Sequence, residues 1–143
     1  MSEGSITIRK RGVVAVIARD NRLLVIRRSQ LVRAPGMHCF PGGGIEPGEQ
    51  EAEAVVREMQ EELNAAIKAV RPLWRYVTSW GVDLAWWLAD LPPEAELIHN
   101  PAEVEAFYWL SIDEIRALPK LLESNLQFLD AHERGEFVID GLS

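Results

Sequence analysis

Residues 43–65 read GGIEPGEQEAEAVVREMQEELNA, and this stretch predicts a glycine-rich turn that leads into a helix. On an ideal helix each residue advances by about 100°, so Glu58, Glu61 and Glu62 fall within an arc of roughly 100°. Like charges at these spacings repel by roughly 0.2–0.5 kcal/mol per pair. A bound cation would relieve the repulsion, and clustered carboxylate oxygens suit Mg²⁺ or Mn²⁺. A solvated acidic face is the alternative.

The same helix has an apolar stripe beside the acidic arc. The stripe consists of Ala52, Val55, Val56, Met59 and Leu63. We expect it to dock on a sheet, which leaves the carboxylates at the rim of the core. There a rigid element would hold the charges without the free-energy cost of burying them fully.

The stretch resembles the Nudix box, whose pattern is G-x5-E-x7-R-E-U-x-E-E-x-G-U, where U is a bulky apolar residue. The matching residues, in chain order, are Gly43, Glu49, Arg57, Glu58, Met59, Glu61 and Glu62. Every charged position of the pattern is filled. Asn64 stands where the family has glycine, and Ala65 where a larger apolar residue is usual. The first departure is mild, because Asn also adopts the left-handed backbone found at helix ends.

The resemblance implies a Nudix hydrolase that uses Mg²⁺ or Mn²⁺ to cleave a pyrophosphate bond in a nucleoside diphosphate linked to another moiety. It implies that the metal ligands are carboxylates of Glu58, Glu61 and Glu62, together with the carbonyl of Gly42. A glycine at this position and its neighbours also permits close approach of a phosphate. A plain glycine turn is the alternative interpretation of the triplet 42–44.

Other residues of the box are expected to support the site rather than bind metal. The resemblance implies that Glu49 and Arg57 pair with each other and, with Gly43, orient the loop against the helix. An ordinary surface ion pair, worth less than about 1 kcal/mol, is the alternative.

The general base is a separate question. In some family members it is a glutamate of the box, in others a glutamate of a later loop. Glu105, in the segment PAEVEAFYW at 101–109, is our first candidate from such a loop, and Glu103 is the second. The alternative is a solvated loop glutamate.

Arg27, Arg28 and Arg33 form a basic group just ahead of the glycines. One of them could reach a substrate phosphate, and Arg28 aligns with a phosphate-contacting arginine of some Nudix members. A solvated strand end is the equal alternative. Trp80 or Trp87 could stack on a substrate base, whereas core packing or a homodimer contact is the competing use of these rings.

Composition indicates one small folded domain spanning residues 1–143. Apolar residues make up 48% of the chain, and its net charge of −7 argues against a nucleic-acid partner. The single Cys39 excludes an internal disulfide framework. No apolar run approaches the ~20 residues that span a bilayer, and the N-terminus MSEGSITIRKRG lacks the apolar core of a signal peptide. We therefore expect a soluble, cytoplasmic protein without a membrane partner.

Hydrophobic patterning predicts alternating strands and helices. The expected strands are Val13–Ala18, Leu23–Ile26, Met37–Phe40, Leu73–Thr78, Val82–Leu88 and Phe107–Leu110. The first two form a hairpin, and the expected helices are Gln50–Leu63, one capped by Ser111, and Leu121–Glu133. Within this order, Trp86 and Cys39 are expected in the core. A mixed β-sheet with helices on both faces accommodates the order, and the Nudix resemblance implies the same α/β/α sandwich.

The sequence leaves the identity of the substrate open. A nucleoside triphosphate or similar small nucleotide is the first choice. A coenzyme A-type substrate is the second, because RRSQLVRAPGMHCFPGG at 27–43 loosely resembles part of the coenzyme A pyrophosphatase element. Two rival functions are a non-catalytic nucleotide-sensing Nudix module and an isopentenyl diphosphate isomerase. The retained box glutamates disfavour the module, and the short chain disfavours the isomerase.

Overall fold

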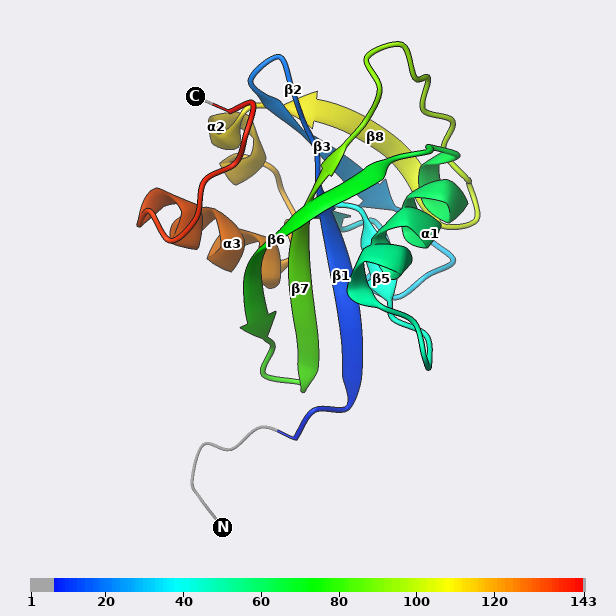
Figure 1. Ribbon diagram of the computed structural model, residues 1–143, viewed down its shortest axis with the longest axis vertical. Coiled ribbons are helices and arrows are strands. Elements are labelled where there is room, and N and C mark those ends of the chain that lie inside the picture. Colours follow the sequence, from blue (N-terminus) through cyan, green and yellow to red (C-terminus); the bar gives the residue numbers. More distant parts are fainter. Residues whose placement is uncertain (1–6, 143) are drawn as a thin grey trace.

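The computed structural model describes residues 7–142, which form two four-stranded sheets and three helices (Figure 1). The first sheet is mixed, in the order β5-β1-β7-β6: Gly42–Gly44, Lys10–Val16, Val82–Asp90 and Lys68–Val77. The second is antiparallel, with β2 (Ala18–Arg19), β4 (His38–Cys39) and β8 (Val104–Leu110) all paired to β3 (Arg22–Arg28). The helices are α1 (Glu51–Leu63), α2 (Ile112–Arg116) and α3 (Glu123–Glu133).

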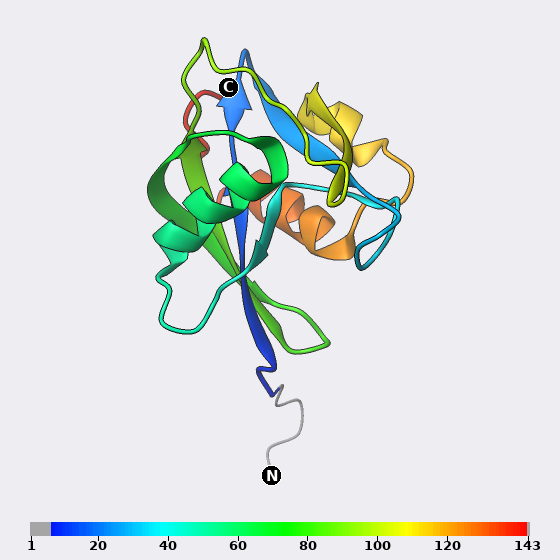
Figure 2. The same cartoon turned by 90° about the vertical axis from the view of Figure 1, so that its right-hand side faces the viewer.

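Helices cover the sheets from both sides. Helix α1 lies on one side, and α2 and α3 lie on the other, as Figures 1 and 2 show. Successive residues of β1 point to opposite faces, so Val13 and Ala15 pack in the core beneath α1, whereas Val14 and Val16 pack in the core beneath α3. Burial on both faces explains the continuous β-branched run. The predicted α/β/α arrangement is therefore confirmed.

The predicted hairpin between Val13–Ala18 and Leu23–Ile26 is wrong for most of its length. Strand β1 pairs with β5 on one edge and in parallel with β7 on the other, so it has no free edge for β3. Only the short β2 pairs with the start of β3. The tight turn at Asp20 and Asn21 is present, with φ values of 50° and 61°.

Two further differences concern strands. The glycine triplet expected as a turn forms strand β5, because its backbone pairs with β1. Strand β6 begins at Lys68 rather than Leu73 and follows its partner β7 through two register shifts. Neither difference was visible in the side-chain pattern, because Gly and Pro are residues that sequence patterns exclude from strands.

The buried side of α1 is rotated from the predicted stripe. Val55, Met59 and Leu63 are buried, as expected, but Val56 is 40% exposed. Glu58 and Glu62 are buried instead, so the expectation of carboxylates at the rim of the core is wrong. The physical reason is space: β5 has no side chains, and α1 can therefore turn its acids towards the sheet.

An aromatic cluster forms the core on the other side. Phe128 of α3 is fully buried and stacks on Trp86 and Phe137, with ring centroids 5.5 and 4.7 Å away. Trp86 is also fully buried, as predicted. Cys39 is buried in the opposite core, where burial raises the pKa of its thiol to about 11. A thiol in this state is a core residue, as expected.

No helix within residues 7–142 is long and apolar enough to cross a membrane. The N-terminal segment in which we expect no signal peptide begins with residues 1–6, which lie outside the described residues.

The C-terminal end of α1 anchors the loop that follows β7. Asn64 ends the helix with φ 52° and ψ 35°, the left-handed conformation expected of a residue in the glycine position of the box. Its side-chain amide donates to the carbonyl of Ile98 at 2.6 Å. Backbone N–H groups of Ile98 and Asn100 donate to the carbonyls of Leu63 and Glu62. The loop is thereby fixed against the helix end.

Replacing Asn64 should separate the contribution of its left-handed backbone from that of its side-chain hydrogen bond to Ile98. Asn64→Ala should lower the free energy of unfolding by about 2 kcal/mol, since a left-handed L-residue costs roughly 1–2 kcal/mol and a lost hydrogen bond roughly 1 kcal/mol. Asn64→Gly should lower it by about half as much, because glycine adopts the left-handed backbone freely. Urea denaturation measures both values, and equal losses in the two variants would refute this account of the helix end.

Candidate active site

Two glutamates of α1 lie buried against the glycine strand β5. Glu58 and Glu62 are only 8% and 5% exposed. A Cβ atom placed on Gly43 would lie 2.3 Å from the carboxyl carbon of Glu58, so any side chain at this position would displace the carboxylate. The backbone N–H of Gly42 lies 3.3 Å from both carboxylate oxygens of Glu62. The carboxylates of helix α1 are thus in direct contact with the backbone of strand β5.

The surroundings of both carboxylates disfavour their charge. Burial raises the pKa of Glu58, partly offset by the nearby charge of Arg57. Burial also raises the pKa of Glu62 well above its usual value, and the charge of Glu58 raises it further. The protein offsets the burial of these two neighbouring carboxylates only in part, which provides a setting in which a cation would be bound favourably.

Arg57 joins the helix to the loop before it. Its guanidinium donates to both carboxylate oxygens of Glu49, at 2.8 and 2.9 Å, and to the carbonyl of Gly44 at 2.7 Å. The hydrogen bonds from Arg57 lower the pKa of Glu49 to about 2. The pairing that the resemblance implied is therefore present in the structure. Through Gly44 it also fixes the strand on which the buried acids rest.

Glu61 is placed differently from its two neighbours. It is exposed, and its carboxylate lies 3.2 Å from Nη1 of Arg57, which also donates to Glu58 at 3.0 Å. In the described part of the chain, no three His, Cys, Asp or Glu side chains converge into a ready-made metal site. The chemistry of the donors still fits an oxygen-preferring divalent ion, because Glu62 is buried with only a long contact to one N–H. Glu61 would join such a site by turning away from Arg57.

The two candidate loop glutamates lie in different surroundings. Glu105 forms an ion pair with Nε of Arg27 at 3.0 Å, and the two side chains are 42% and 40% exposed. Glu103 lies near enough to the box acids for its charge to raise the pKa of both Glu58 and Glu62. Sequence reasoning ranked Glu105 first; of the two, Glu103 is the one whose charge acts on the box acids. The anchoring of the preceding loop on α1 explains this placement.

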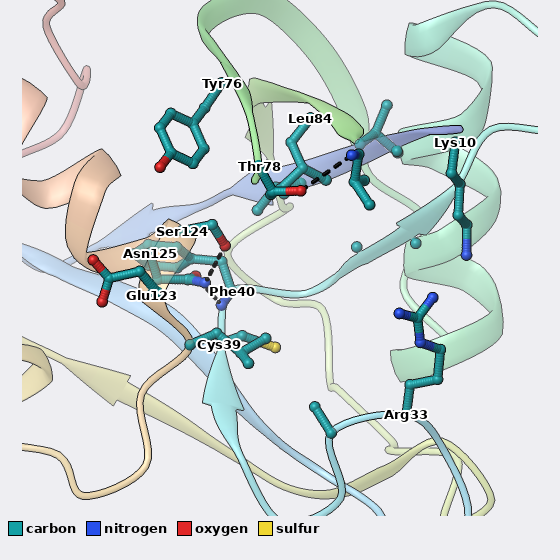
Figure 3. Close-up of a pocket in the computed structure, with 18 of the residues that line it drawn as sticks. Lys10, Arg33, Cys39, Phe40, Tyr76, Thr78, Leu84, Glu123, Ser124 and Asn125 are labelled. Atoms are coloured by element: carbon teal, nitrogen blue, oxygen red, sulfur yellow. Dashed lines mark hydrogen bonds between the residues drawn. The ribbon is translucent and has the colours of Figure 1, made fainter. Parts of the chain in front are cut away.

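A cavity of about 330 Å³ opens beside β5 (Figure 3). Its cationic wall contains Arg28 and Arg33, which the sequence indicated, and Lys10, which it did not. Arg27 does not line the cavity and pairs with Glu105 instead. Lys10 carries no local sequence signal, because the pairing of β1 with β5 and β7 places it at the cavity.

The remaining walls of the cavity carry apolar, hydroxyl and amide side chains and the carboxylate of Glu123. Tyr76, Trp80 and Leu84 come from β6, β7 and the turn between them, and Asn125 comes from α3. The amide oxygen of Asn125 accepts a hydrogen bond from the Phe40 backbone at 2.9 Å. Trp80 is 70% exposed at this cavity, whereas Trp87 is partly buried and donates to Glu51. Of the two tryptophans singled out from the sequence, only Trp80 borders the cavity.

Comparison with known proteins agrees with this geometry. The family model described as NUDIX domain matches residues 8–132. Nudix hydrolase 3 of Caenorhabditis elegans is 32% identical over 111 residues, which are 72% of this chain and 46% of that protein. CTP pyrophosphohydrolase of Escherichia coli K12 is 30% identical over 123 residues, covering 83% of this chain and 87% of that protein.

The extent of these matches varies. The chain spans less than half of the C. elegans protein, and 38% of the NAD-capped RNA hydrolase NudC of Stutzerimonas stutzeri, to which it is 30% identical. Among solved structures, the E. coli ORF135 protein has a TM-score of 0.71 at 25% identity, covering 94% of both chains. The MutT protein of Methanosarcina mazei Go1 has a TM-score of 0.72 at 22% identity, covering 94% of this chain and 98% of that one. The chain therefore belongs to the Nudix domain family.

Proposed function

We propose that this protein hydrolyses a pyrophosphate bond in a nucleoside diphosphate linked to another moiety, with a nucleoside triphosphate as the first candidate substrate. The observation that carries the proposal is the pair of buried carboxylates, Glu58 and Glu62, held against a strand without side chains. The resemblance over most of both chains to a CTP pyrophosphohydrolase supports a nucleoside triphosphate.

The proposed cofactor is Mg²⁺ or Mn²⁺. The carboxylates of Glu58, Glu61 and Glu62 and the carbonyl of Gly42 would hold it. When bound, a divalent cation stabilises the charge that develops on phosphoryl oxygens during hydrolysis. Arg57 would keep these ligands in place, because it fixes α1 to the glycine strand.

A carboxylate of the protein would act as the general base that accepts a proton from the attacking water. Water adds to one phosphorus, the bond to the bridging oxygen breaks, and two phosphorylated products leave. A carboxylate with a raised pKa is suited to accept the proton. Glu103 and the box glutamates are the candidates supported by their position, while Glu105 remains a candidate only if it leaves Arg27.

The cavity supports a small nucleotide as the substrate. Its aromatic and apolar wall of Tyr76, Trp80 and Leu84 offers a surface for a base, and Lys10 in its cationic wall lies next to Gly44 of the glycine strand. A coenzyme A-type substrate is the second candidate, and a non-catalytic nucleotide sensor is the third.

A substrate screen tests the proposed function. We expect Mg²⁺- or Mn²⁺-dependent cleavage of at least one nucleoside triphosphate or nucleoside diphosphate derivative, with no turnover in excess chelator. Released phosphate after phosphatase treatment reports cleavage, and product analysis identifies the bond. Cleavage of coenzyme A alone would favour the second candidate. Binding of nucleotides without cleavage would favour the sensor and refute hydrolysis.

Glu62→Gln should separate activity from stability. Loss of a metal-binding charge should raise the activation free energy by about 3 kcal/mol or more, which lowers kcat on the order of 100-fold or more. In chelator at pH 7 the variant should unfold at a higher temperature, by roughly 3–5 °C for about 1 kcal/mol, because it lacks a buried charge. The raised pKa of Glu62 means that its charge destabilises the fold above that pKa. The difference in unfolding temperature between the variant and the natural protein should therefore shrink as the pH falls through the pKa of Glu62.

Calorimetry with and without Mg²⁺ measures this stability effect. Mg²⁺ should stabilise the natural protein and not the variant. The matched control is Glu94→Gln, which neutralises an exposed loop glutamate and should change neither kcat nor the unfolding temperature. Full activity in Glu62→Gln would refute the assigned site.

A further inference from the structure

Two cations face each other across the cavity without partners. Lys10 and Arg33 both line it, and Figure 3 shows their charged ends pointing towards one another. Within residues 7–142, neither side chain has a hydrogen-bonding or ion-pair partner. Other arginines nearby are engaged: Arg57 with glutamates and Arg27 with Glu105. The arrangement is unusual in a chain with a net charge of −7, because the two cations repel each other.

Lys10 lies against the glycine strand on the face opposite the buried acids. A Cβ atom on Gly44 would lie 3.2 Å from Cε of Lys10, whereas one on Gly43 would collide with Glu58. Successive residues of a strand point to opposite faces. Strand β5 therefore has the carboxylates on one face and the ammonium group on the other, and the box glutamates do not line the cavity. Because β5 is the edge strand of its sheet, a phosphate chain that crosses this edge can reach both faces.

Arg33 is held by the loop that carries it. Nε of Arg28 donates to the backbone carbonyl of Arg33 at 2.6 Å. The next residue, Ala34, has a φ of 50°, in the left-handed region that is unfavourable for a residue with a Cβ. Backbone strain of this kind persists where the surrounding structure fixes it, and it gathers at ligand sites. The hydrogen bond from Arg28 thus helps to hold the strained loop where Arg33 faces Lys10.

We propose that Lys10 and Arg33 clamp a phosphate group of the substrate that lies beyond the bond to be broken. This proposal rests on the proposed function and deepens it. A terminal phosphate offers several charged oxygens, which two converging cations can bind at once. A nucleoside diphosphate capped by a neutral sugar has no such group. The clamp therefore selects substrates with a triphosphate chain over substrates with a neutral second moiety.

The magnitude of the selection follows from the strength of such contacts. A hydrogen bond to a charged group contributes roughly 1.5 kcal/mol or more, which is about tenfold in affinity. Each cation should therefore contribute about tenfold to the preference, chiefly through KM, because the clamp acts on a phosphate that does not react.

The test compares one base in two substrates, CTP and a cytidine diphosphate sugar. Lys10→Ala and Arg33→Ala should each lower the ratio of kcat/KM for CTP to kcat/KM for the sugar nucleotide by about tenfold, and Lys10→Arg should restore most of it. Lys68→Ala, which removes an exposed lysine outside this cavity, is the matched control and should leave the ratio unchanged. An unchanged ratio in the Lys10 and Arg33 variants would overturn the clamp.

A binding measurement keeps the clamp testable if hydrolysis fails. Calorimetric titration with a methylene-bridged cytidine triphosphate in Mg²⁺ gives Kd directly. The double variant should bind about 100-fold more weakly than the natural protein. Equal affinities, or no binding by the natural protein, would overturn the clamp. Failure of the natural protein to cleave any nucleotide would instead overturn the proposed function, whatever the affinities.

Discussion

The contact between the carboxylates of α1 and the bare backbone of β5 determines much of the surrounding structure. Glu58 can approach the strand only because Gly43 has no side chain, and Glu62 rests on the N–H of Gly42. A fold that buries two like charges this way is less stable than it could be without a cation. Such a cost is common where function requires a charged site, and here it lies on a rigid helix rather than on a loop.

Two sets of hydrogen bonds keep this contact in place. Arg57 fixes the N-terminal half of the arrangement by joining α1, the loop at Glu49 and the carbonyl of Gly44. At the other helix end, Asn64 and the backbone of α1 hold the loop that brings Glu103 to the acids. Both sets act on the positions of the carboxylates. Changes in either would therefore alter the site without touching the charged ligands.

The local part of the site could be predicted from the sequence, and the part that depends on distant contacts could not. The spacing of the box predicted the helix and, by resemblance, the pair of Arg57 with Glu49, because both lie within one short segment. The rotation of α1 that turns Glu58 and Glu62 towards the sheet depends on strand β5, and the glycine pattern of this strand predicted a turn instead. The position of Glu103 relative to the box acids likewise depends on hydrogen bonds that fix the loop to α1, which lie outside the local sequence pattern. Lys10 reaches the cavity through the pairing of β1 with two strands that are distant in sequence, β5 and β7.

Anomalous diffraction from crystals soaked in Mn²⁺ tests the central claim most directly. The account predicts a manganese peak bonded to carboxylate oxygens of Glu58 and Glu62, with Glu61 released from Arg57. Crystals in which the two buried glutamates bind no manganese, and Glu61 stays on Arg57, would contradict it.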